Sequence, residues 1–197
     1  IDTHPHVLHF GTRQRAVLDI TDCKNHAEIV DRIRERAAVT PPGEWIVTTP
    51  VGEPHYFVRR SYRDLEERRL PDRMVLDQAT TEHPVHIEAW APRLPNVCAF
   101  NTAGLRKCAL TDTTPDRVSD VHFERADDGS LTGILHGAVN NYYCFDPFWV
   151  QIRSHLPGPA TWELHESTVE EMADYNARGV TTVFEGHNMA PGHIAAY

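Results

Sequence analysis

The chain has 197 residues, of which 41% are hydrophobic and 24% are charged, a composition typical of a globular protein with one domain or slightly more. Its formal net charge of −9 argues against a nucleic-acid partner, because no basic stripe is present to neutralise phosphates. No apolar run is long enough to cross a bilayer and no leader is apparent, so we expect no membrane partner and a cytoplasmic protein. The four cysteines lack a Cys-x-x-Cys spacing, which excludes a zinc knuckle and fits a reducing compartment.

The chain opens with two histidines at the expected end of a β-strand, in Ile1-Asp2-Thr3-His4-Pro5-His6. Because strand side chains alternate between faces, His4 and His6 would point to the same side. Neutral imidazoles in that arrangement suit a divalent metal such as Zn, Fe or Mn. The chain has 13 histidines, however, so such a pair also arises by chance and does not establish a metal site alone.

A helix and a strand are predicted next. Asn25 can cap a helix with Glu28 three residues later, and the apolar stripe of that helix is formed by Ile29, Val30, Ile33 and Ala37. Residues 41–43, Pro-Pro-Gly, end the helix, and residues 45–49 predict a strand.

The middle of the chain predicts short elements. A charged helix is expected over 64–70 and a half-buried strand over 84–90. Residues 97–109 have a helical pattern, with a buried side made of Cys98, Phe100, Leu105 and Cys108. The segments 121–125 and 131–135, joined by a turn around Asp128-Gly129, predict a β-hairpin.

The last forty residues have the order of an α/β repeat. After Pro157-Gly158-Pro159, residues 160–178 predict an amphipathic helix whose inward residues are Leu164, Val169, Met172 and Ala173. Gly179 stands at the C-cap position, and residues 180–184 predict a buried parallel strand. Helix, glycine, strand and polar tip in that order are the repeating unit of an α/β barrel.

Several stretches together resemble the metal-dependent amidohydrolase superfamily, and within it the family-3 branch typified by N-substituted formamide deformylases. The opening resembles the Ile-Asp-x-His-x-His signature. The further matching stretches, in chain order, are Pro42-Gly43-Glu44-Trp45-Ile46, Leu76-Asp77 with Pro84-Val85, Asn101-Thr102-Ala103-Gly104-Leu105, Asp128-Gly129-Ser130-Leu131-Thr132-Gly133-Ile134-Leu135 and Gly179-Val180-Thr181-Thr182-Val183. The resemblance covers nearly the whole chain.

This resemblance implies an α/β fold, a partial (β/α)8 TIM barrel with an inserted α+β lid domain. Residues 1–19 would be the first barrel strand and its loop. Residues 20–157 would be the insertion, and residues 158–197 a helix, the second barrel strand and the start of the next helix.

The resemblance also implies a site. His4 and His6 are carried over as ligands of one or two divalent ions, with zinc the first choice. Glu185 and His187, at the tip of the second strand, and Asn96 are candidates for substrate contact or for holding other site residues. The implied reaction is hydrolysis of a carbon–nitrogen, amide-type bond in a small molecule by metal-activated water.

In the superfamily, later strands supply further ligands and a catalytic aspartate, so we expect the isolated chain to be a fragment with little or no activity. Two other interpretations stay open. One is a non-enzymatic ligand- or protein-binding module with incidental histidines, and the other is a cysteine or serine hydrolase, for which no Gly-x-Ser-x-Gly is present. The residues do not determine the substrate, the metal or whether the protein is a homo-oligomer.

Overall fold

The computed structural model describes residues 1–2, 7, 17–52, 60–89, 96–140, 144–158 and 161–184. The chain divides into two compact units, one formed by Ile1–Val17 with Gly158–Tyr197 and the other by Leu18–Pro157. In the part of the chain that is described, no helix has both the length and the apolar character needed to span a membrane.

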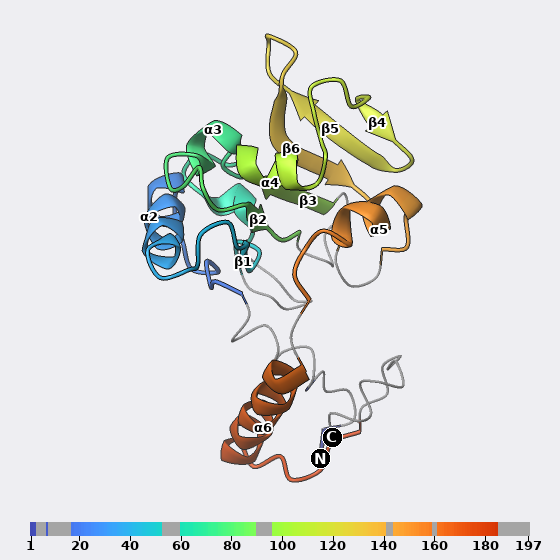
Figure 1. Ribbon diagram of the computed structural model, residues 1–197. Helices are drawn as coiled ribbons and strands as arrows, with labels where there is room; N and C mark the ends of the chain where they lie inside the picture. The colour runs from blue at the N-terminus through green and yellow to red at the C-terminus, as the bar shows by residue number, and fades with distance from the viewer. Residues whose placement is uncertain are drawn as a thin grey trace. The chain divides into compact units, whose positions relative to one another are not determined.

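The larger unit is built on one mixed sheet (Figure 1). Its strands stand in the order β1-β2-β3-β6-β5-β4, and only β1 and β2 pair in parallel. The strands are β1 Ile46–Thr48, β2 Val85–Ile87, β3 Asn96–Phe100, β4 Arg117–Val118, β5 Val121–Arg125 and β6 Leu131–Gly137.

The helices are short, apart from two. In chain order they are α2 His26–Ala37, the 3₁₀ helix η1 Tyr62–Asp64, α3 Arg73–Leu76, α4 Thr102–Lys107, α5 Pro147–Arg153 and α6 Thr161–Ala177. The predicted cap of α2 is confirmed, because the Asn25 side chain accepts a hydrogen bond from the Glu28 backbone N–H at 3.0 Å. The predicted stripe of α2 is confirmed too: its buried residues are Ile29, Val30 and Ile33.

Two apolar clusters cover opposite faces of the sheet. Along β3, Val97 and Ala99 belong to one cluster, while Cys98 and Phe100 belong to the other. This alternation follows from the pleat of a strand. The first cluster includes Ile29 and Ile33 of α2, and the second includes Trp149 of α5. The larger unit is therefore a sheet with a buried apolar cluster on each of its two faces.

Two element predictions are wrong. The helical pattern over 97–109 is in fact β3 followed by the short helix α4, because a strand buried on both faces carries a continuous apolar run. The charged helix predicted over 64–70 is replaced by η1, which ends at Asp64. The Asp64 carboxylate accepts a hydrogen bond from the Ser61 backbone N–H at 2.7 Å, and Arg68 adopts a positive φ of 57°, which a helix does not tolerate.

The predicted hairpin is present as β5 and β6, antiparallel and with a register shift between Phe123 and Arg125. Gly129 turns the chain at a φ of 85°. Gly133 has a φ of 87°, and a Cβ there would lie 2.2 Å from the Phe100 carbonyl oxygen. Only glycine therefore fits this crossing of β6 against β3.

In the smaller unit, α6 ends as predicted. Gly179 has a φ of 79°, its N–H donates to the Asn176 carbonyl, and the Val180 N–H donates to the Tyr175 carbonyl. These two bonds form a Schellman cap. The segment 180–184 pairs in parallel, but the predicted burial is not seen, since Phe184 is 66% exposed.

The inward face predicted for α6 is wrong. Val169 is 67% exposed and Met172 is 45% exposed, whereas the buried residues on this helix are Ser167, Thr168 and Glu171. Ala173 is also exposed, and the side chain of Leu164 lies outside the described residues. Periodicity locates an apolar stripe, but the neighbours of a helix decide which side is covered.

We expect Val169→Ser to change the free energy of unfolding by no more than about 0.5 kcal/mol, because substitutions on exposed surfaces have small effects. The matched control is Val30→Ser on the buried face of α2, which should cost more than about 2 kcal/mol through lost burial. Urea denaturation followed by circular dichroism measures both changes. An equal loss in both variants would mean that the α6 stripe is covered.

Candidate functional site

The smaller unit brings together the two chain segments that lead to the predicted metal site. Asp2 and Val183 form a parallel β-bridge. The Asp2 N–H donates to the Thr182 carbonyl at 2.9 Å, and the Phe184 N–H donates to the Asp2 carbonyl at 3.0 Å. Since the pairing is parallel, both segments run in the same direction, one toward His4 and the other toward Glu185.

The predicted site residues His4, His6, Glu185 and His187 lie outside the described residues. Asn96 is described: it begins β3, pairs with Gly137 of β6 and is 5% exposed. It belongs to the larger unit, whereas the four other candidates belong by sequence to the smaller one. Across the described ranges, no three His, Cys, Asp or Glu side chains are arranged to hold a metal ion.

Several of the motif residues form one hydrogen-bonded junction around Asn101, which is fully buried. Its Oδ1 accepts from the backbone N–H groups of Val85 and Gly104, both at 2.8 Å. Its Nδ2 donates to the carbonyls of Thr80 and His83, at 3.0 and 2.9 Å. The side-chain amide thus caps α4 and ties this helix to β2 and to the loop before β2.

A second cap lies beside the first. The Asp77 carboxylate accepts from the Thr102 backbone N–H at 3.0 Å and from the Thr102 hydroxyl at 2.6 Å. Gly104 has no room for a side chain, because a Cβ there would lie 2.7 Å from the Val85 carbonyl oxygen. Asp77, Val85, Asn101 and Gly104, which the sequence resemblance singled out, therefore serve the architecture of the larger unit.

A buried imidazole lies between the aromatic rings of the second apolar cluster. His86 of β2 is fully buried and stacks on Phe100, with ring centroids 4.4 Å apart. Trp149 lies 6.2 Å away on the same side. Burial lowers the pKa of His86 to about 3, with a backbone hydrogen bond involving Ala99 acting in the opposite direction. The imidazole is therefore neutral at physiological pH.

The buried thiols are poorly suited to nucleophilic catalysis. Burial raises the pKa of Cys23 to about 11 and that of Cys108 to about 12, and it raises the pKa of Cys98 well above its ordinary value. The thiolate is the reactive form, so these three cysteines are inert at neutral pH. This observation argues against a cysteine hydrolase built on them.

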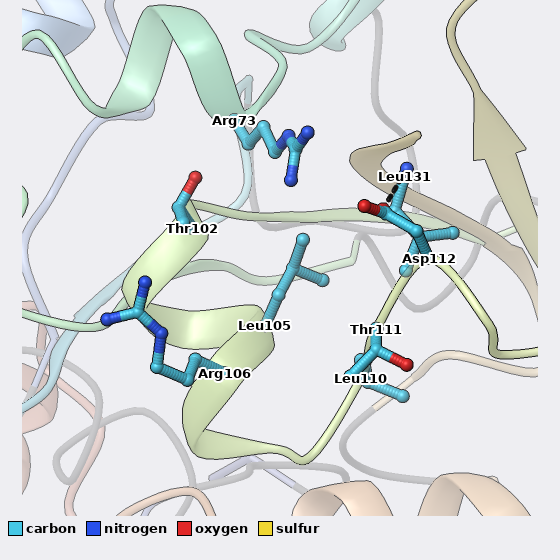
Figure 2. Close-up of a pocket in the computed structure, with 8 residues that line it drawn as sticks. All are labelled: Arg73, Thr102, Leu105, Arg106, Leu110, Thr111, Asp112 and Leu131. Carbon is cyan, nitrogen blue, oxygen red and sulfur yellow. Dashed lines mark hydrogen bonds between the residues drawn. The ribbon is translucent and has the colours of Figure 1, made fainter. Parts of the chain in front are cut away.

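The structure also contains a hollow that the sequence did not predict (Figure 2). It has a volume of about 250 Å³ and lies in the larger unit. Its lining comes from α3, α4, the segment after α4 and the start of β6, and consists of Arg73, Thr102, Leu105, Arg106, Leu110, Thr111, Asp112 and Leu131.

A model of the amidohydrolase family matches residues 1–195 of the chain. The chain belongs to the amidohydrolase family. The superfamily inferred from the opening His-x-His and the ordered motifs is thereby confirmed, and the formamide deformylase-like branch stays a prediction.

Solved structures agree in fold. An uncharacterized metal-dependent hydrolase from Pyrococcus horikoshii OT3 is 18% identical, with a TM-score of 0.55, over 99% of this amidohydrolase chain and 32% of its own. An uncharacterized metal-dependent hydrolase from Pyrococcus furiosus is 17% identical, with a TM-score of 0.56. The match covers 100% of this chain and 33% of the chain from Pyrococcus furiosus. The chain thus spans about a third of the length of these structures. A search of curated proteins found no match.

Proposed function

We propose that the protein is a metal-dependent hydrolase of carbon–nitrogen bonds, in which His4 and His6 are metal ligands and Glu185 and His187 lie near them. The observation that carries this proposal is the parallel pairing of Asp2 with Val183 in a chain of the amidohydrolase family. In a parallel α/β sheet, sites are built at the carboxyl ends of neighbouring strands. His4 follows Asp2 by two residues, and Glu185 follows Val183 by two.

The donor set fits a divalent cation of the transition series. Two imidazoles with a nearby carboxylate and a further imidazole are ligands that zinc accepts, so zinc is the metal we propose. A metal bound there supplies a Lewis acid that polarises a carbonyl and lowers the pKa of water. Glu185 could orient a ligand imidazole by accepting its second N–H, which fixes the tautomer that binds metal.

The barrel would be a (β/α)8 barrel with the larger unit as its inserted lid, and the branch would be the formamide deformylase-like one. The substrate would be a small amide-type molecule in the cytoplasm.

The proposal predicts that zinc binds to the chain through His4 and His6. Equilibrium dialysis against zinc should show one site that is weakened about tenfold or more in His4→Ala and in His6→Ala, since each change removes one ligand. Activity is not the readout, so the test does not depend on the chain being a complete enzyme.

The matched control is His155→Ala, an exposed histidine just after α5 in the larger unit. It should leave zinc affinity unchanged, because it removes an imidazole outside the proposed site. If all three variants bind zinc as the wild type does, His4 and His6 are not ligands, and a binding module with incidental histidines becomes the better account.

A further inference from the structure

We propose that the hollow between α3, α4 and the start of β6 binds a small organic carboxylate, with the Arg73 guanidinium on its anionic group and three leucines around its apolar body. The proposal concerns the larger unit and is independent of the hydrolase assignment. It rests on the charges that line the hollow, on its size and on its apolar surface.

The first observation is a positive charge that is not held in a direct ion pair. Among the described residues, Arg73 and Arg106 form no ion pair and their guanidinium groups donate no hydrogen bond, although six other arginines do pair: Arg32, Arg34, Arg69, Arg117, Arg125 and Arg178. The chain carries a net charge of −9, so carboxylates are plentiful. Arg73 does interact with a carboxylate, because the pKa of Asp128 is lowered by hydrogen bonds from Ser130 and also by attraction to Arg73. Since no carboxylate forms a direct ion pair with it, the Arg73 guanidinium can still accept an anion from solution.

The second observation is the placement of that charge. In Figure 2, Arg73 extends over the hollow above Leu105, with Asp112 and Leu131 across from it. Arg106 stands at the rim on the Thr102 side, and its guanidinium turns outward. Arg73 is therefore the residue that faces a bound ligand, while Arg106 contributes a more distant charge.

The opposite wall is held in position by hydrogen bonds. The Asp112 carboxylate accepts from the Leu131 backbone N–H at 2.8 Å (Figure 2). The Asp112 carbonyl accepts from the Arg125 guanidinium at 3.1 Å, and the same guanidinium donates to the Gly129 carbonyl at 2.6 Å. These contacts join the segment after α4 to the β5–β6 hairpin, so the wall is formed before any ligand arrives.

Size and charge select the ligand class. A volume of about 250 Å³ is below the range of about 300–1,000 Å³ that is usual for drug-sized ligands, so the ligand is small. Leu105, Leu110 and Leu131 supply apolar surface for its body. Asp112 repels any anion in the hollow, but it repels a phosphate group, which carries up to two negative charges, more than a carboxylate, which carries one. A carboxylate with an apolar body fits these three conditions best.

The test uses the whole 197-residue chain and phenylacetate as the probe, followed by the ¹H–¹⁵N spectrum of the backbone amides. Saturable shifts are expected at residues 105–112 and 131, with a Kd on the order of 1 mM, as is usual for so small a ligand. Arg73→Gln should weaken binding about tenfold, and Arg106→Gln should weaken it less. The matched control is Lys107→Gln on the same helix, outside the lining, which should change Kd less than about twofold.

Two further ligands make the result decisive. Phenylacetamide, which has the same shape without the charge, should bind at least about tenfold more weakly than phenylacetate. Inorganic phosphate, which has no apolar body, should also bind more weakly. If Arg73→Gln does not fold, as its amide spectrum would show, Arg73→Lys keeps the charge without the planar fork and should still weaken binding. Absent shifts, equal binding of the amide or of phosphate, or unchanged affinity in the Arg73 variants would overturn the proposal.

Discussion

Replacing Asn101 by alanine should cost the larger unit about 3–5 kcal/mol of unfolding free energy. The change removes four hydrogen bonds at once and leaves the N–H groups of Val85 and Gly104 and two carbonyls buried without their partner. Unsatisfied buried groups are more costly than the net value of the bonds themselves. Urea denaturation measures this loss. A loss of that size is comparable with the whole free energy of unfolding of a marginally stable domain.

Two variants separate this junction from ordinary capping. Asn101→Asp keeps both acceptor bonds but turns a buried carboxylate oxygen toward the Thr80 and His83 carbonyls, so we expect a loss at neutral pH no smaller than with alanine. Asn25→Ala removes the cap of α2, which is a single hydrogen bond from the Glu28 backbone N–H. This change should lower the free energy of unfolding by about 1 kcal/mol. A loss at Asn101 no greater than at Asn25 would show that the four bonds do not act together.

Acid should destabilise the larger unit through His86. Its pKa is about 3 in the folded protein against an ordinary value of 6.5. Between these values the unfolded chain binds one more proton than the folded one, so stability rises with pH. The contribution is fully present above pH 6.5 and is lost as pH falls toward 3. From pH 6.5 to 4.5 the loss is about 2 kcal/mol, because the slope approaches about 1.36 kcal/mol per pH unit only below pH 6.5.

The measurement is the free energy of unfolding against pH for the wild type and for His86→Phe, which keeps an aromatic ring against Phe100 without a titrating group. The difference between the two proteins should change by about 2 kcal/mol over that pH range. His122→Phe, an exposed histidine on β5, is the control and should leave the pH profile nearly unchanged. Parallel pH profiles of wild type and His86→Phe would mean that His86 titrates normally.

The sequence predicted those helices and hairpins whose ends carry a capping residue or a turn glycine. Asn25 and Glu28 located the start of α2, and the Asp128-Gly129 turn located the β5–β6 hairpin. The strand β3 was missed because a short apolar run that is buried on both faces has no period of its own. Its five residues fit a helix equally well. The exposed stripe of α6 was assigned to the wrong side because the covering neighbours, not the helix, decide burial.

The candidate site could be predicted only in part. The His-x-His pair and the ordered motifs were enough to infer the superfamily, which the match over residues 1–195 confirms. They did not reveal that Asp77, Asn101 and Gly104 serve packing and capping, since a cap and a catalytic residue have the same appearance in one sequence. The hollow at Arg73 was invisible because residues 73, 102–112 and 131 meet only in the fold.

Whether His4 and His6 hold a metal together is tested most directly by X-ray absorption at the zinc edge on the zinc-loaded chain. We expect scattering from imidazole nitrogens at about 2.0–2.1 Å, with part of this shell lost in His4→Ala and again in His6→Ala. A zinc environment without imidazole scattering, or one that is identical in the wild type, His4→Ala and His6→Ala, would contradict the proposed metal site.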